Sequence, residues 1–507
     1  MPIPSVSSLS RRGVFLSALV GLALLPAAVR AADKAEVVPF SPGPYIPDIA
    51  TFLNIGACSP AGYSWDGKTV YFTASMSGAG QVYRITDQGW PYQLTTFEDG
   101  IEGFNLSWNG AMAIVSASVG GDENAQLYLL DTDTGRIEPL TQQPKVQFGS
   151  VTWIPDDSGI YYRSNEENGK DFFIYRMDFP SRKVTKVYDK TEGYNSVAEL
   201  SLDNTIMIVS NSTSNVNNDL YVLDLKSGQS RQLTKDTGDV SYESVNLMPD
   251  KKTIWLTSNG NPDGISKLGT MSIDSPEISW VNDGWLDPKW EVEGVSFSRD
   301  YKTMAVRQNE DGYGRLKMRE VSSKKPLPNP PLDGILGSVL FDKDGACILS
   351  FSGPTRAPDV WKWNPRTKEL KQLTYTIYAG IDRNLFKDPQ LVRYPTFDGR
   401  MIPAFMYLPP NYKPGTPVPF VVDAHGGPES QFRPDFIRNF QYLMLIGYGV
   451  LAPNVRGSSG YGIEDLNLDN YKNRKDSLKD YKAGVDWLVK EGYTKPGMIG
   501  IRGGSYG

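Results

Sequence analysis

The sequence predicts a β-propeller of about seven blades, followed by the first part of an α/β domain. Three observations support this prediction. A short motif recurs at intervals of 43 to 50 residues, apolar strands alternate with helices after about residue 385, and the chain closes on a glycine- and serine-rich turn, Gly503 to Gly507. With 507 residues, the chain is also long enough for more than one domain.

Residues 1–31 are expected to be a secretory signal and not part of the fold. Arg11 and Arg12 precede an apolar run over residues 14–29, and Val29-Arg30-Ala31 offers small residues for cleavage. The run holds 16 residues, whereas a spanning helix needs about 20. The arginine pair resembles a twin-arginine signal, and the alternative is an ordinary signal whose basic end contains two arginines. We therefore expect an exported protein, periplasmic or extracellular, with no membrane partner after signal removal.

The composition is that of a globular protein, with 40% hydrophobic and 22% charged residues. The net charge of −6 and the absence of a basic block argue against a nucleic-acid partner. Cys58 and Cys347 lie too far apart in sequence to imply a disulfide framework, so we expect two buried thiols. A disulfide is the alternative, because export would permit one. The residues indicate no metal and no cofactor, and they do not define an oligomeric state.

A repeated motif organises residues 45–380. It consists of an apolar residue, usually Ser, any residue, and Asp or Asn. Its copies begin at Tyr63, Leu106, Trp153, Leu200, Leu247, Phe297 and Phe341. Apolar alternations bounded by Gly, Asn, Asp and Pro lie between the copies, and several units close on Leu-Thr, as at Leu94-Thr95.

A period of 40 to 50 residues with several strands per unit is typical of propeller blades. Blades stack in a ring because a single blade cannot bury both of its faces. The motif count gives seven blades, and the weaker fifth and sixth units leave six or eight as alternatives. A β-sandwich is the alternative fold, which the regular spacing disfavours.

Residues 385–507 are predicted to be α/β. Strands over 391–397 and 400–408 meet at Asp398-Gly399, which is a strong hairpin signal. Further strands are expected over 419–424, 449–452 and 498–502, with helical spacing around 436–444 and a helix over about 477–491. The apolar stripe of this last helix is predicted to be Leu478, Tyr481, Val485, Leu488 and Val489. Alternating strands and helices predict a parallel sheet, which binds ligands at the carboxyl ends of its strands.

The final residues, Gly503-Gly504-Ser505-Tyr506-Gly507, have the form Gly-x-Ser-x-Gly. A glycine-rich turn can carry this pattern without any function, but here it follows a predicted strand of an α/β domain. In that context it is the nucleophile elbow of an α/β-hydrolase, which makes Ser505 the predicted nucleophile. The acid and base of such enzymes follow the serine in the chain. We therefore expect residues 385–507 to be an incomplete α/β-hydrolase domain, and this chain to be an inactive fragment that lacks the Asp and His of the triad.

The segment His425-Gly426-Gly427-Pro428 follows the strand predicted over 419–424. The oxyanion hole of an α/β-hydrolase combines the N–H of the residue after the serine, here Tyr506, with an N–H from this loop. Gly426 or Gly427 is the expected second donor, and each such donor contributes about 2.7–4 kcal/mol in the transition state. His425 is the only histidine. We interpret it as a residue that shapes the rim and not as the base, because it precedes the nucleophile in the chain.

Two other groups of residues attract attention in the propeller. Glu166-Glu167 would suit an acidic pocket for a peptide amino terminus, but a solvated turn between two strands is the favoured interpretation. Trp361 and Trp363 are interpreted as blade packing.

The propeller, His425-Gly426-Gly427-Pro428, the segment from Asn454-Val455-Arg456 to Gly462 and the Gly503–Gly507 elbow together resemble the prolyl oligopeptidase family of serine peptidases (family S9). Within it, the chain looks most like the acylaminoacyl-peptidase and dipeptidyl-peptidase branches. The resemblance implies hydrolysis of short peptides through an acyl-enzyme on Ser505, with the propeller limiting access. It also implies an oxyanion region at Tyr506 and the His425–Gly427 loop, and places Arg456 at the rim.

Two other functions remain open at this point. An esterase or lipase would carry the same elbow, but the propeller disfavours it. A non-catalytic propeller that binds a partner would have no need of an intact elbow and oxyanion loop.

Overall fold

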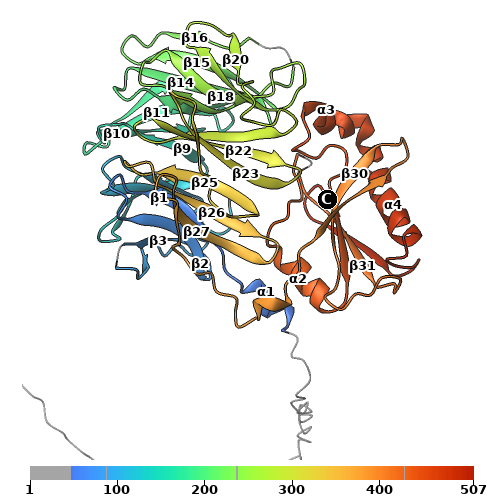
Figure 1. Cartoon of the computed structure of the whole chain (residues 1–507). Helices are drawn as coiled ribbons and strands as arrows, with labels where there is room; N and C mark the ends of the chain where they lie inside the picture. The colour runs from blue at the N-terminus through green and yellow to red at the C-terminus, as the bar shows by residue number, and fades with distance from the viewer. Residues whose placement is uncertain (1–46, 87, 236–237, 428) are drawn as a thin grey trace, which may run out of the picture. The chain divides into compact units, whose positions relative to one another are not determined.

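The computed structural model describes residues 47–507 apart from Asp87, Asp236, Thr237 and Pro428. The expected signal over residues 1–31 therefore lies outside the described residues. Figure 1 shows the two regions that the strands form: a series of four-stranded sheets over residues 58–372, and one five-stranded sheet between residues 390 and 503. In this part of the chain, no helix combines the length and the apolar character that crossing a bilayer requires.

The prediction of seven blades is confirmed, because residues 58–372 form seven antiparallel four-stranded sheets. Blade 1 contains β1 (Cys58–Tyr63), β2 (Val70–Ser77), β3 (Ala79–Ile85) and β4 (Tyr92–Gln93). Blade 2 contains β5 (Gly103–Leu106), β6 (Met112–Ala117), β7 (Gln126–Asp131) and β8 (Ile137–Pro139). Blade 3 contains β9 (Phe148–Trp153), β10 (Gly159–Ser164), β11 (Phe173–Asp178) and β12 (Val184–Tyr188).

The remaining four blades follow in the same order. Blade 4 contains β13 (Tyr194–Leu200), β14 (Ile206–Ser214), β15 (Asn217–Asp224) and β16 (Ser230–Gln232). Blade 5 contains β17 (Tyr242–Leu247), β18 (Thr253–Ser258), β19 (Lys267–Ser272) and β20 (Ile278–Trp280). Blade 6 contains β21 (Glu291–Phe297), β22 (Thr303–Glu310), β23 (Tyr313–Glu320) and β24 (Pro326–Leu327). Blade 7 contains β25 (Ile335–Phe341), β26 (Cys347–Gly353), β27 (Arg356–Asn364) and β28 (Glu369–Gln372).

The repeated motif is the turn between the first and second strands of a blade. In blade 1, Ser64 donates its hydroxyl hydrogen to Asp66 at 2.8 Å and accepts the N–H of Thr69 at 2.9 Å. The same hydroxyl-to-side-chain bond recurs in blades 2, 4 and 6, as Ser107–Asn109, Ser201–Asp203 and Ser298–Asp300. Ser and Asp or Asn therefore recur because they bond backbone groups that the turn leaves without a strand partner. The residue between them is not needed for this bonding.

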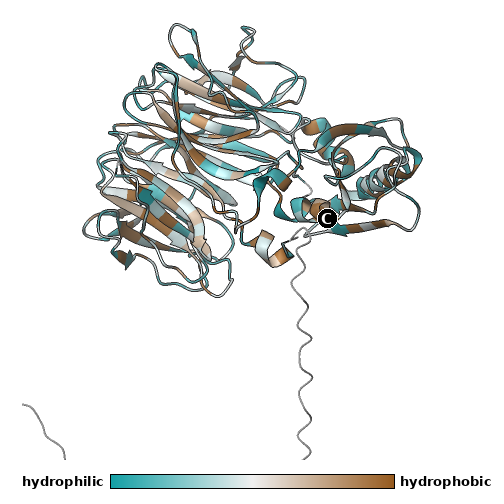
Figure 2. Cartoon of the chain, turned by 60° about the horizontal axis from the view of Figure 1, so that its bottom comes forward, coloured by the Kyte–Doolittle hydropathy of each residue, from teal (hydrophilic) through white to brown (hydrophobic). Residues whose placement is uncertain are grey.

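The Leu-Thr ending of several units also has a hydrogen-bonding role. The Thr95 hydroxyl oxygen accepts the N–H of Val82 on β3, and Thr374 does the same for Val360 on β27, both at 2.9 Å. The outermost strand of each blade is short, so this bond extends the pairing beyond its end. Hydrophobic residues are distributed over the strands of the blades (Figure 2). Some second strands contain continuous buried runs, such as residues 207–209 of β14, because both faces of a blade pack against neighbouring sheets.

The ring closes between blades 7 and 1 through side chains and loops, because each blade is a continuous piece of chain. Tyr63 donates to the Asp342 carboxylate at 3.2 Å, and Lys343 N–H donates to the carbonyl oxygen of Trp65 at 3.0 Å. Apolar side chains from both blades form a shared cluster that includes Cys58 and Ile348. Trp363 is also buried in blade 7, which supports its interpretation as packing.

The two cysteines are free and buried, which confirms the prediction of two thiols. Burial raises the pKa of both the Cys58 and the Cys347 thiol, so little reactive thiolate forms at neutral pH. We expect neither thiol to react with Ellman's reagent in the native protein and both to react in denaturant. Rapid reaction of one thiol under native conditions would show that a blade 1 or blade 7 strand opens readily.

The second region contains a mixed sheet with the strand order β29-β30-β32-β31-β33. Its strands are β29 (Gln390–Pro395), β30 (Met401–Tyr407), β31 (Phe420–Ala424), β32 (Gly449–Pro453) and β33 (Ile499–Gly503). The β29–β30 hairpin is antiparallel, whereas β31 pairs in parallel with both β32 and β33. The carboxyl ends of β31, β32 and β33 therefore meet at one edge, where His425, Asn454 and Gly504 follow them.

Short helices surround this sheet. They are α2 (Arg438–Leu445), α3 (Ile463–Leu466) and α4 (Arg474–Lys490), with the 3-10 turns η1 (Arg383–Leu385), η2 (Asn467–Asp469) and η3 (Tyr471–Asn473). Before the propeller, α1 (Ile49–Leu53) begins at Asp48, whose carboxylate accepts the Thr51 N–H at 2.8 Å. Phe52 of α1 packs edge-on against Tyr442 of α2, with ring centroids 5.4 Å apart.

The prediction for α4 was wrong in one respect. Leu478 is 65% exposed and does not belong to the buried face. The buried residues are Ser477, Asp480, Gly484 and Leu488, at the spacing of one helical face. Two polar side chains and a glycine occupy this face because it packs against Arg456 and Tyr394. Apolar periodicity alone therefore assigned Leu478 to the wrong face.

Candidate active site

Ser505 lies at the turn that follows β33. Its φ of 55° is in the left-handed region, and its side chain is exposed. Gly507 N–H donates to the carbonyl oxygen of Gly504 at 3.0 Å, which closes the turn. A Cβ at Gly503 would overlap the carbonyl oxygen of Gly507, and one at Gly507 would overlap that of Ala424. The glycines at both ends of the motif are thus required because the turn folds back against its own strand and against β31.

The loop after β31 passes directly beside the serine. A Cβ at Gly426 would lie 3.1 Å from the Ser505 Cβ and 3.7 Å from its Oγ. Gly426, one of the two glycines predicted as an oxyanion donor, thus lies beside Ser505. Within the described residues, the N–H groups of Gly426, Gly427 and Tyr506 donate to no protein acceptor. These three donors remain free for a ligand oxygen next to the nucleophile.

The ring of His425 is directed away from this role. Its Nδ1 lies 2.8 Å from the Gly426 carbonyl oxygen, and its Nε2 lies 2.9 Å from the Ser458 hydroxyl. Burial lowers the pKa of His425 and favours the neutral ring. A neutral ring with the proton on Nδ1 donates to the Gly426 carbonyl oxygen. Its Nε2 faces the Ser458 hydroxyl, which donates to the Val455 carbonyl oxygen at 2.6 Å. Both nitrogens face these groups, and neither contacts Ser505.

Tyr506 has a buried acidic neighbour that the sequence did not single out. Its hydroxyl donates to the Asp469 carboxylate at 3.4 Å, and the Arg474 guanidinium lies 4.9 Å from its ring centroid. Asp469 is only 2% exposed, and burial raises its pKa. Gly457 is required here because a Cβ at that position would overlap the Asp469 carboxylate. Gly457 belongs to the motif between residues 454 and 462, which was the only signal that pointed to this contact.

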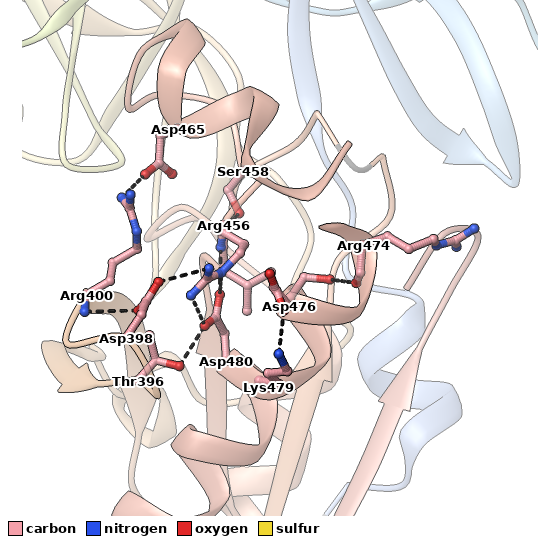
Figure 3. Close-up of polar contacts among 12 residues, drawn as sticks. Thr396, Asp398, Arg400, Arg456, Ser458, Asp465, Arg474, Asp476, Lys479 and Asp480 are labelled. Atoms are coloured by element: carbon pink, nitrogen blue, oxygen red, sulfur yellow. Dashed lines mark hydrogen bonds and ion pairs between the residues drawn. The ribbon is translucent and has the colours of Figure 1, made fainter. Parts of the chain in front are cut away.

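Arg456 lies behind the rim in a buried ion cluster, which Figure 3 shows. Its Nε and Nη2 donate to the two Asp480 oxygens at 2.8 and 2.9 Å, and its Nη1 lies 3.1 Å from Asp398. Thr396 adds a 2.7 Å hydrogen bond to Asp480. Arg456 is 5% exposed and Asp480 is fully buried. The carboxylates raise the pKa of Arg456. The N–H groups of its guanidinium bind Asp480 and Asp398, so Arg456 joins the loop after β32 to α4 and to the β29–β30 hairpin.

A cavity of about 470 Å³ adjoins the elbow between β33 and α4. Its walls are largely apolar and include Tyr481, Val485 and Ile501, together with Tyr506. Ser505 does not line it, so this cavity lies behind the turn and not over the nucleophile.

Glu166 and Glu167, the acidic residues considered for a peptide amino terminus, both have polar partners. Glu167 pairs with Lys186 at 2.8 Å, and Glu166 accepts a hydrogen bond from Gln143 at 3.3 Å, both from the turn between β10 and β11. This is the arrangement of a solvated turn. Across residues 47–507, with the gaps given above, no group of His, Cys, Asp or Glu side chains is placed to hold a metal ion.

Comparisons with known proteins agree with this geometry. The model described as the prolyl oligopeptidase N-terminal beta-propeller domain matches residues 98–282, and the model described as the prolyl oligopeptidase family matches residues 434–507. Dipeptidyl aminopeptidase BIII of Pseudoxanthomonas mexicana is 24% identical over 463 residues, covering 87% of this chain and 65% of the relative. A prolyl endopeptidase of Elizabethkingia miricola is 24% identical, covering 80% and 58%. The chain thus spans less than two thirds of the length of these relatives.

Solved structures share the fold. A prolyl endopeptidase superimposes with a TM-score of 0.78 at 18% identity, over 91% of this chain and 71% of that one. A puromycin hydrolase superimposes with a TM-score of 0.74 at 17% identity, over 89% and 74%.

Proposed function

Since the chain belongs to the prolyl oligopeptidase family, we propose that the protein is a serine peptidase that hydrolyses short peptides through Ser505. The observation that carries the proposal is the elbow itself. Ser505 is exposed on a left-handed turn, with the free N–H groups of Tyr506 and Gly426 or Gly427 beside it. This is the arrangement that acyl transfer requires, because a tetrahedral oxyanion needs donors next to the attacking hydroxyl.

The proposed reaction proceeds in two steps. Ser505 Oγ attacks the carbonyl carbon of the scissile peptide bond while a general base takes its proton, and the N–H donors bind the oxygen that becomes negative. The amine leaves with a proton from the base, and water then hydrolyses the acyl-enzyme in the same way. Arg456 has no direct part in this scheme. It holds the loop that carries Ser458, and Ser458 orients His425.

We also propose that His425 is not the general base of this reaction. His425 is the only histidine in the sequence, and its ring nitrogens are engaged elsewhere. The chain as given is expected to cleave a panel of dipeptidyl and prolyl p-nitroanilides no faster than its Ser505→Ala variant. Rapid cleavage that depends on Ser505 would contradict this and would return His425 to consideration.

Substrate class separates the proposal from an esterase. In a peptide-cleaving form of the protein, an amide and an ester of the same acyl group should both be cleaved, and the amide should be cleaved efficiently. Hydrolysis of the ester alone would favour the esterase.

Export is proposed on the arginine pair and the apolar run, and amino-terminal sequencing of secreted protein should find a start close to residue 32.

A further inference from the structure

The axis of the propeller contains a cavity of about 600 Å³. Side chains from the innermost strands of all seven blades line it, among them Phe104, Thr152, Glu199 and Ser296. It lies where these strands end, and therefore beside the turns that join the first and second strand of each blade.

This end of the propeller is the one remote from the second region. Contacts to the second region come from the opposite end, both from the turns that join second and third strands and from the starts of first strands, as where Gly462 N–H donates to Glu291 of β21 at 2.8 Å. In blade 6, for example, Asn309 donates to Gln431 at 2.7 Å, and the Gly312 carbonyl oxygen accepts from Arg433 at 2.8 Å. The turn that contains Arg299 is at the other end of the same blade.

Three side chains from blades 6, 1 and 2 meet at this end of the axis, and two of them, Arg299 and Trp108, line the cavity. The Arg299 guanidinium of blade 6 lies 5.3 Å from the Trp65 ring centroid of blade 1 and 5.4 Å from that of Trp108 in blade 2. Its Nη1 also donates to the Trp108 carbonyl oxygen at 3.4 Å. A guanidinium within about 6 Å of an indole face is attracted by the ring quadrupole. Arg299 thus reaches past blade 7 to bridge blades 1 and 2.

The three residues occupy the same place in the sequence repeat. Each is the third residue of its motif, the position that the turn does not need for hydrogen bonding. Across the seven blades this position holds Trp65, Trp108, Pro155, Leu202, Pro249, Arg299 and Lys343. Because the turn does not constrain this residue, its side chain can differ between blades and can cover the axis of the ring. The two tryptophans and the arginine are the members that contact one another.

We propose that Arg299, Trp65 and Trp108 form a latch that closes the remote end of the propeller axis to peptide-sized molecules. The latch is built from non-covalent contacts between partly exposed side chains, with Trp65 41% and Trp108 37% exposed. Removal of the guanidinium would leave the two indoles without a cation and would widen this end of the cavity. This proposal concerns the propeller alone and does not depend on peptidase activity.

Thiol accessibility tests the latch. Ser296 lines the cavity, and a Ser296→Cys variant places a reporter there. Cys58 and Cys347 are buried and contribute little background. The rate of labelling with a small methanethiosulfonate and with the larger fluorescein maleimide is measured. We expect Arg299→Ala in the Ser296→Cys background to raise the maleimide rate at least 10-fold and the methanethiosulfonate rate much less.

Two further variants make the result decisive. Arg182→Ala removes an arginine that also stacks on an aromatic ring, Phe179 at 4.6 Å, but that lies outside the cavity, and it should leave both rates unchanged. Trp65→Leu should accelerate the maleimide as Arg299→Ala does, which covers the case in which the arginine variant folds poorly. Fast maleimide labelling with Arg299 in place, or equal rates with and without it, would overturn the latch. Circular dichroism and the thermal midpoint verify that each variant is folded.

Discussion

Ser505→Ala in a peptide-cleaving form of the protein is expected to lower kcat/KM by about 10⁴-fold or more. The substitution removes the attacking oxygen, so only the binding contacts and the oxyanion donors can still assist hydrolysis. The fold should not change, because the Ser505 side chain is exposed. The measurement is the initial rate of peptide p-nitroanilide cleavage, with labelling by a fluorophosphonate probe as a second readout of the nucleophile.

The matched control for this substitution is Ser323→Ala. Ser323 is an exposed serine in the propeller whose hydroxyl donates to Glu320. It should retain full activity and full stability. If the Ser505→Ala variant kept its activity or were still labelled by the probe, another residue would be the nucleophile.

Asp480→Ala is expected to destabilise the second region by about 3–5 kcal/mol. Asp480 is fully buried and accepts from the backbone N–H, Nε and Nη2 of Arg456 and from Thr396. Without it, Arg456 would be a buried cation whose remaining ion-pair partner is Asp398, which is 40% exposed. An uncompensated buried charge costs more than the lost contacts alone. The thermal unfolding midpoint should fall by several degrees.

Asp486→Ala is the control on the same helix. Asp486 pairs with Lys482, but the two side chains are 62% and 74% exposed, and surface pairs of this kind contribute about 0–1 kcal/mol. The contrast between the two aspartates isolates burial as the cause. Equal midpoints for Asp480→Ala and Asp486→Ala would mean that Asp398 and solvent compensate Arg456 fully.

The parts of the fold that the sequence predicted are those whose causes are local. The blade turns could be recognised because Ser64 and Asp66 bond the backbone only a few residues away. The elbow could be recognised for the same reason, since Gly503 and Gly507 are required by a turn of five residues.

The parts that could not be predicted depend on contacts between distant segments. Nothing near Arg456 in the chain indicates that Asp480 and Asp398 surround it, and Asp469 becomes a neighbour of Tyr506 only in the folded sheet. The exposed side of α4 was misassigned because its buried face contains Asp480, which binds an arginine, as well as the apolar Leu488. The latch joins residues more than 190 positions apart, at a repeat position that varies freely from blade to blade.

The contact between blades 7 and 1 differs mechanically from the other contacts between neighbouring blades. The ring has seven joints, one between each pair of neighbouring blades. A chain connection spans six of them, but not the seventh joint between blades 7 and 1, and no two blades share a strand. Separation at the seventh joint would break side-chain and loop contacts but would leave the hydrogen bonding of every blade intact. The two chain segments that leave this joint meet outside it, where Gly56 N–H donates to the carbonyl oxygen of Ile377 at 2.9 Å and Phe52 packs near Phe386. The ring should therefore deform mainly between blades 7 and 1. The contacts between residues 52–56 and 377–386 limit how far these two blades can separate.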